Sequence, residues 1–234
     1  MASGRLRYVV LSLAVFYLLV LTVPGFLYPG LSFPADFFTP LFNTMAYSTA
    51  ATLAGLPAAL LLAFYASRRE IGGIIPVLTF STAIPHTAIG LLLLPLFTRF
   101  GIVDTAPAII VAMIIVSLPI GTGSLISAFA STQKSLDEFL QPLGLNDLQI
   151  IGLHVRASSL GVVASIILMW LRCFSELGAF LIVANRPLTV GVYLFELFNR
   201  GGAAAAVLFS LILAVTGLLF STVLYVISRK AGVR

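Results

Sequence analysis

Two charged side chains inside an apolar stretch are the residues of this chain best suited to chemistry. Arg172 and Glu176 are four positions apart, with Ser175 between them. Residues at this spacing share one helix face, and charges in such a segment are costly unless they face a partner or a wet cavity. Two interpretations stay open: an ion pair that packs the molecule, or a gate or path lining where arginine attracts an anion and glutamate restrains it.

A second candidate lies in residues 84–90, where Pro85 precedes His86 and Thr87. Proline disrupts helical hydrogen bonding, and broken backbone within a membrane is tolerated where it is buried in protein or lines a cavity. His86 and Thr87 would then contact a solute, whereas the alternative is a helix kink with a satisfied histidine. His154 lies in another segment with no carboxylate at ligand spacing, so we expect no metal site.

The other motifs do not predict an enzyme. The run Gly121-Thr-Gly-Ser124 follows Pro119 but lacks the lysine of a phosphate loop, so we expect it to permit close helix packing. No serine–histidine pair stands in a nucleophile context. No nucleotide-binding motif is present, so we expect no cofactor in this chain, and any ATP that drives transport must bind to another subunit.

Composition predicts an all-α membrane protein in which these residues are positioned by membrane-spanning helices. The 234 residues are 60% hydrophobic and only 9% charged, and a soluble domain cannot hide that much apolar surface. A bilayer core of about 30 Å takes roughly 20 helical residues. Six stretches satisfy this length and form one transmembrane domain, 1–234, with expected spans at 8–27, 41–66, 74–98, 108–130, 160–184 and 203–228.

Basic residues predict the orientation of the chain in a cell membrane. With the N-terminus inside, nine lysine and arginine residues fall in inside segments and three in outside segments, Arg99, Arg186 and Arg200. The positive-inside rule therefore places both termini and the loop 131–159 in the cytoplasm. The net charge of +5 is explained by orientation, so we expect membrane lipid and no nucleic acid as a partner.

The loop between the fourth and fifth spans predicts a helix–glycine–helix hairpin at 136–151. Gly144 can adopt the left-handed conformation that ends a helix, and Asn146 or Asp147 can cap the next one. Its apolar stripe is too short to span lipid, so we expect it to pack on another protein. Apolar side chains of the hairpin that we expect to contact this partner include Leu136, Phe139, Leu140, Leu143 and Leu148.

These segments resemble the permeases of ABC importers, in particular the molybdate/tungstate branch. Glu138 stands six residues before Gly144, as in the family's coupling motif, although Phe139 and Leu140 replace two alanines. Residues 84–94, 175–184 and 188–202 resemble that branch, and the resemblance runs from about Ser48 to the C-terminus.

The resemblance implies the permease subunit of an ATP-driven importer for an inorganic oxyanion such as tungstate or molybdate. It further implies a homodimer with a pore between subunits, cytoplasmic ATPase subunits that bind the ATP, and an external solute-binding protein. The residues implied to couple this chain to the ATPase are Glu138, Phe139, Leu140, Leu143, Gly144 and Leu148. The alternatives are a secondary transporter or channel, which would need ion-coupling carboxylates in several spans, and an intramembrane enzyme.

Overall fold

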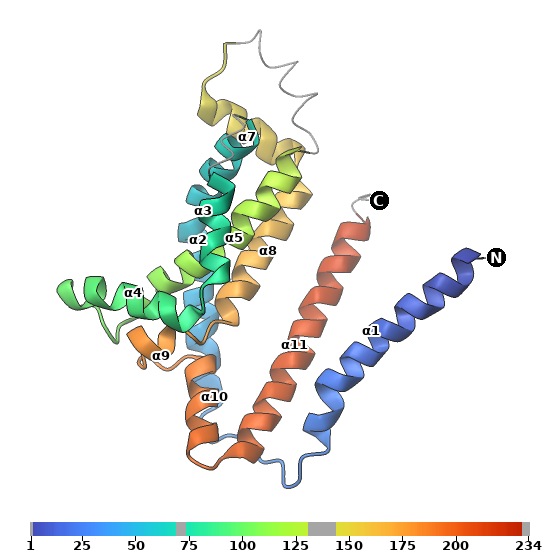
Figure 1. Cartoon of the computed structure of the whole chain (residues 1–234), viewed down its shortest axis with the longest axis vertical. Helices are drawn as coiled ribbons and strands as arrows, with labels where there is room; N and C mark the ends of the chain where they lie inside the picture. The colour runs from blue at the N-terminus through green and yellow to red at the C-terminus, as the bar shows by residue number, and fades with distance from the viewer. Residues whose placement is uncertain (1, 69–73, 131–143, 231–234) are drawn as a thin grey trace. The chain divides into compact units, whose positions relative to one another are not determined.

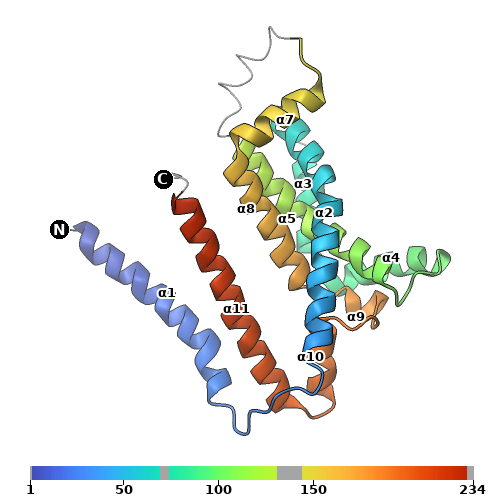
Figure 2. The same ribbon diagram turned by 180° about the vertical axis from the view of Figure 1, so that it is seen from behind.

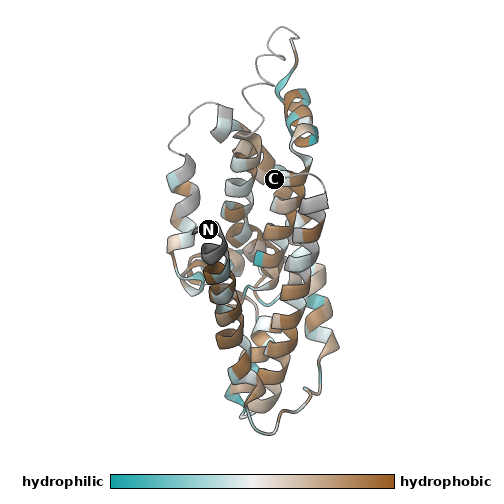
Figure 3. Cartoon of the chain, turned by 90° about the vertical axis from the view of Figure 1, so that its right-hand side faces the viewer, coloured by the Kyte–Doolittle hydropathy of each residue, from teal (hydrophilic) through white to brown (hydrophobic). Residues whose placement is uncertain are grey.

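The computed structural model describes residues 2–68, 74–130 and 144–230, and within these ranges every regular element is a helix. The helices are α1 (Ala2–Phe26), α2 (Phe38–Arg68), α3 (Ile74–Ala83), α4 (His86–Arg99), α5 (Ala106–Ala130), α7 (Asp147–Ala157), α8 (Ser159–Phe174), α9 (Phe180–Val183), α10 (Val190–Asn199) and α11 (Ala203–Lys230). Figure 1 shows their order along the chain. Figure 3 shows hydrophobic residues along most of the length of the helices.

Backbone contacts divide the chain into two compact units, and the boundary falls within α10. One unit comprises Met1–Phe37 and Tyr193–Arg234, and the other comprises Phe38–Val192. In the first unit α1 contacts α11, where a β-carbon at Gly25 would lie 2.7 Å from Leu211 Cδ2. The expectation of one transmembrane domain stays a prediction.

The second unit is built around α2, α5 and α8, which lie side by side (Figures 1 and 2). Lipid is as apolar as a leucine side chain, so close packing of small residues is a main source of helix association in membranes. Ala59 and Ala63 on α2, and Ala108 and Ala112 on α5, are fully buried at four-residue spacing. These pairs let the helix backbones approach closely.

Three helices are long and apolar enough to cross a membrane: Tyr8–Phe26, Phe38–Ser67 and Ala106–Ala130. Helices α7 and α8 taken together are also long and apolar enough to cross a membrane, but the chain bends by 90° between them, at Ser158. Shorter apolar helices cover His86–Arg99, Val190–Asn199 and Ala203–Leu219. The described residues therefore give three spans, or four with the bent pair, and the remaining expected spans stay predictions.

Two of the expected spans are not continuous helices. Within 74–98, α3 ends at Ala83 and α4 begins at His86, and α4 runs across the direction of α2 and α5 (Figures 1 and 2). Pro85 has extended backbone, φ −54° and ψ 134°, and proline also disfavours helical backbone at Ile84. Within 160–184, α8 ends at Phe174, and only the short α9 follows.

The run Gly121–Ser124 packs α5 against α8, as the sequence predicts. A β-carbon at Gly121 would overlap the Sδ and Cγ atoms of Met169 on α8. Two positions further on, Gly123 faces open space. Ser165 Oγ lies 2.7 Å from Ser124 Oγ and joins the same two helices.

Gly121→Ala should therefore destabilise the protein relative to Gly123→Ala. Both changes add a methyl group to one helix, so the gain in helix propensity cancels, and overpacking against Met169 should cost about 1–3 kcal/mol. Unfolding of the purified protein in detergent measures the difference. In a Met169→Ala background, which removes the overlapping atoms, Gly121→Ala should cost little more than Gly123→Ala. Equal stability of the two single variants in the unmodified background would contradict this packing.

Candidate functional site

The break between α3 and α4 lies against the turn that follows α8. Gly178, in that turn, is so close to α4 that an added β-carbon would lie 2.9 Å from His86 Cβ and 3.1 Å from Thr87 N. At Gly90, one turn into α4, a β-carbon would lie 2.7 Å from Ala179 O. Two glycines therefore allow the two irregular segments to touch.

The Glu176 carboxylate lies at the centre of this contact and is held by three donors. Its Oε2 accepts from Arg172 Nη2 at 2.9 Å and lies 3.2 Å from His86 Nδ1. Its Oε1 accepts from Ala179 N at 2.9 Å. A buried carboxylate needs such partners, because an unpaired charge in a low-dielectric interior costs several kcal/mol. The cluster therefore links the end of α8, the following turn and the start of α4.

With its proton on Nδ1, the His86 ring can donate to Glu176 and accept from Arg172 at Nε2, although Arg172 Nη2 lies equally close to Nδ1. Arg172 Nη2 lies 2.6 Å from both ring nitrogens of His86, and arginine is only a donor. In this tautomer Nε2 accepts from Arg172, and Nδ1–H donates to Glu176. The tautomer is assigned from the hydrogen-bond network.

The three side chains differ in exposure. Glu176 is fully buried, whereas 16% of the Arg172 side chain and 35% of the His86 side chain are exposed. The donors therefore have an open side, and the carboxylate lies behind them. Such a cluster can neutralise its own charges, and it can also present cationic and imidazole groups to a solute.

The other residues expected at a pore or gate stand apart from these hydrogen bonds. Pro85 and Thr87 are exposed at the start of α4. Ser175 is exposed, and its hydroxyl donates to the Arg172 carbonyl at 3.3 Å. Sequence reasoning named the charged residues but missed the Ala179 amide and Gly178. The one local signal for them was a glycine two residues after a glutamate in an apolar run.

The loop residues Glu138, Phe139, Leu140 and Leu143, which the sequence implicates in coupling, lie outside the described residues. Gly144 is described and has φ +61°, the left-handed conformation expected for it. Asn146 caps α7: its side chain accepts from Gln149 N, and the Gln149 side chain accepts from Asn146 N. This capping box fixes where α7 begins.

The two faces of α7 have different environments. Ile150 and Ile151 are buried in the second unit, whereas Leu148 is 74% exposed. Figures 1 and 2 show α7 lying across the end of the helices that it contacts. Because the opposite face of α7 packs against the second unit, the exposed Leu148 can contact another protein.

Side-chain contacts seat α7 on α2 and α5. Tyr65 OH donates to Asp147 Oδ2 at 2.9 Å. The His154 ring lies 6.0 Å from the Phe64 ring and 5.6 Å from the Phe129 ring, measured between centroids. Any force applied to α7 would therefore reach α2 and α5 through these contacts.

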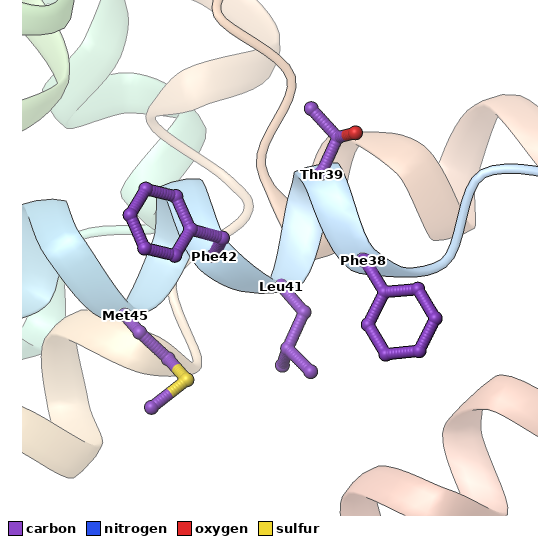
Figure 4. A pocket seen from close by; sticks show the side chains of 5 residues that line it. All are labelled: Phe38, Thr39, Leu41, Phe42 and Met45. Carbon is purple, nitrogen blue, oxygen red and sulfur yellow. The ribbon is translucent and has the colours of Figure 1, made fainter.

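An open hollow of about 540 Å³ at the start of α2 is a poor candidate for an anion site. Figure 4 shows its lining, the side chains of Phe38, Thr39, Leu41, Phe42 and Met45. Only Thr39 among them carries a polar side chain, and an anion needs several donors or a cation. The hollow therefore does not compete with the Arg172 cluster as a solute site.

Comparisons with known proteins agree with the resemblance. No protein-family model matches the chain. It is 31% identical over 177 residues to the molybdate/tungstate transport system permease protein WtpB of Pyrococcus abyssi, covering 73% of this chain and 70% of the relative. The protein of the same name from Pyrococcus furiosus is 30% identical, covering 70% and 67%. That from Methanocaldococcus jannaschii is 26% identical, covering 78% and 75%. The chain therefore belongs to the family of molybdate/tungstate transport system permease proteins.

Proposed function

We propose that this chain is the membrane-spanning permease subunit of an ATP-driven importer for an inorganic oxyanion, tungstate or molybdate. The observation that carries the proposal is the 31% identity to a permease named for these two anions, over 73% of this chain and 70% of that permease. The apolar helices support a multi-pass membrane protein. Chemistry in such a subunit is conformational, since inward- and outward-facing states exchange as partners bind ATP.

The partners follow from this function. Two cytoplasmic ATPase subunits bind and hydrolyse ATP, an external solute-binding protein delivers the anion, and two copies of the chain form the pore. Both termini and the loop 131–159 face the cytoplasm, which the distribution of lysine and arginine supports.

Helix α7 is the part of the described chain that best fits contact with the ATPase. It follows the loop that resembles the coupling motif, its Leu148 is exposed, and its opposite face is fixed to α2 and α5 through Tyr65 and His154. ATPase movement would then act on helices that pack against α8.

Reconstitution tests the proposal. The chain, co-expressed with an ATPase and placed in liposomes with a binding protein, should take up tungstate or molybdate only when ATP is present on the cytoplasmic side. Co-purification of a soluble ATPase should accompany this activity. Uptake that needs an ion gradient but no ATP would instead indicate a secondary transporter, and passive uptake would indicate a channel.

Leu148→Asp should abolish co-purification of the ATPase without lowering membrane abundance of the chain. Burying a large apolar side chain at an interface is worth roughly 1.5–3 kcal/mol, and a buried unpaired carboxylate adds a further cost. Leu148→Met keeps the apolar volume and should retain the partner. Undiminished assembly of Leu148→Asp would remove Leu148 from the docking surface.

Gly144→Val should leave membrane insertion intact but uncouple ATP hydrolysis from uptake. A β-branched residue is strained at φ +61°, so the turn before α7 would change. Gly101, between α4 and α5, has a similar φ of +64° and open space around it, so Gly101→Val introduces the same backbone strain away from α7 and is the matched control. Measuring uptake per ATP hydrolysed decides the matter: normal coupling in Gly144→Val would place the essential turn elsewhere.

A further inference from the structure

The donors around the Glu176 carboxylate are the kind that proteins use to bind oxyanions. A guanidinium group, an imidazole N–H and a backbone amide converge on its two oxygens, from Arg172, His86 and Ala179. Guanidinium groups match planar and tetrahedral oxyanions because their N–H groups form a rigid fork. The site therefore already holds an anionic group, one that belongs to the chain itself.

The cluster also has capacity for a second anion on its open side. All hydrogen bonds recorded for the Arg172 side chain, within the described part of the chain, use Nη2. The rest of the fork carries three more N–H donors. Arg172 and His86 are partly exposed, whereas Glu176 is not. An anion that approaches from the open side would meet these donors before the carboxylate.

We propose that Arg172 and His86 form a transient oxyanion-binding subsite, and that the Glu176 carboxylate keeps its affinity low by neutralising the charge of Arg172 and holding the His86 N–H. The proposal rests on the proposed function, since it needs an oxyanion to traverse the chain. A conduction pathway needs sites that bind well enough to admit the solute and weakly enough to release it. The cationic donors would admit the anion, and the internal carboxylate would keep its binding weak enough for release.

The position of His86 supports the same assignment. His86 is the first residue of α4, a helix of 14 residues, and Arg172 lies at the end of α8. The N-terminal end of a helix carries partial positive charge, so α4 favours an anion at His86, whereas the partial negative charge at the end of α8 is offset by Arg172.

The competing account is that Arg172 and Glu176 form only a packing pair. In that case removing both charges should be harmless, because no uncompensated charge remains. The two accounts therefore differ in what they predict for Arg172→Met combined with Glu176→Gln. They also differ for Glu176→Gln alone, which removes the competing anion and leaves the cation.

The test measures binding of isotope-labelled tungstate to the full-length chain in lipid nanodiscs, without a binding protein, and uptake by the reconstituted importer. Glu176→Gln should bind tungstate at least about tenfold more tightly than the unmodified chain and should take it up more slowly at normal abundance, because release is impaired. The double variant should accumulate normally, bind no tungstate and show little uptake. Sulfate should compete in Glu176→Gln, since the donors recognise any tetrahedral oxyanion.

The pair Glu196 and Arg200, in which the Arg200 side chain is 74% exposed, provides a matched control, because it has the same spacing and a contact of 3.3 Å. Glu196→Gln and its combination with Arg200→Met should change neither binding nor uptake. Unchanged binding in Glu176→Gln, or full uptake by the Arg172–Glu176 double variant, would overturn the subsite. If Glu176→Gln fails to accumulate, uptake by the double variant decides alone. Failure of the proposed function would look different, since the unmodified chain would then show no ATP-driven uptake.

Discussion

A buried carboxylate that must be paired is the constraint on which the centre of this structure depends. Glu176 lies in an apolar environment where an ionised group is tolerated only with donors around it. Its donors come from the last turn of α8, from the backbone of the following turn and from the first residue of α4. One side chain thus joins two places where the helical backbone is interrupted.

The pairing depends on close backbone approach, and small residues make that approach possible. Gly178 lies against His86, and Gly90 lies against the Ala179 carbonyl. A third glycine, Gly191, comes so near the Glu176 carbonyl that a β-carbon would lie 2.9 Å from it. Close backbone contacts therefore surround the cluster on several sides. These contacts keep the charged side chains at fixed distances from one another, although the backbone at both breaks is not helical.

Sequence patterns correctly predicted the features that depend on local residues alone. Hydropathy found the long helices α1, α2 and α5, because their apolar runs have the length that a bilayer needs. Proline chemistry indicated the break at Pro85, and glycine chemistry indicated the left-handed turn at Gly144. Asn146 was one of two proposed caps of α7, and the structure selects it.

Sequence patterns did not predict the features that depend on tertiary contacts. Residues 175–184 are nearly as apolar as α8, so hydropathy extended the fifth span through them, whereas the helix ends at Phe174. The hydrogen bond from the Ala179 amide to the Glu176 side chain belongs to that turn and has no periodic signature. His86 and Arg172 are 86 positions apart, and their meeting could not be read from either motif alone.

A double-mutant cycle between His86 and Glu176 tests most directly whether the carboxylate joins the two breaks. The free energy of unfolding in detergent would be measured for the unmodified chain, His86→Ala, Glu176→Gln and the combination. Contacting residues in one network show coupling energies of roughly 0.5–3 kcal/mol, and we expect about 1 kcal/mol here. Additive effects, within about 0.3 kcal/mol, in variants that still fold would contradict the account.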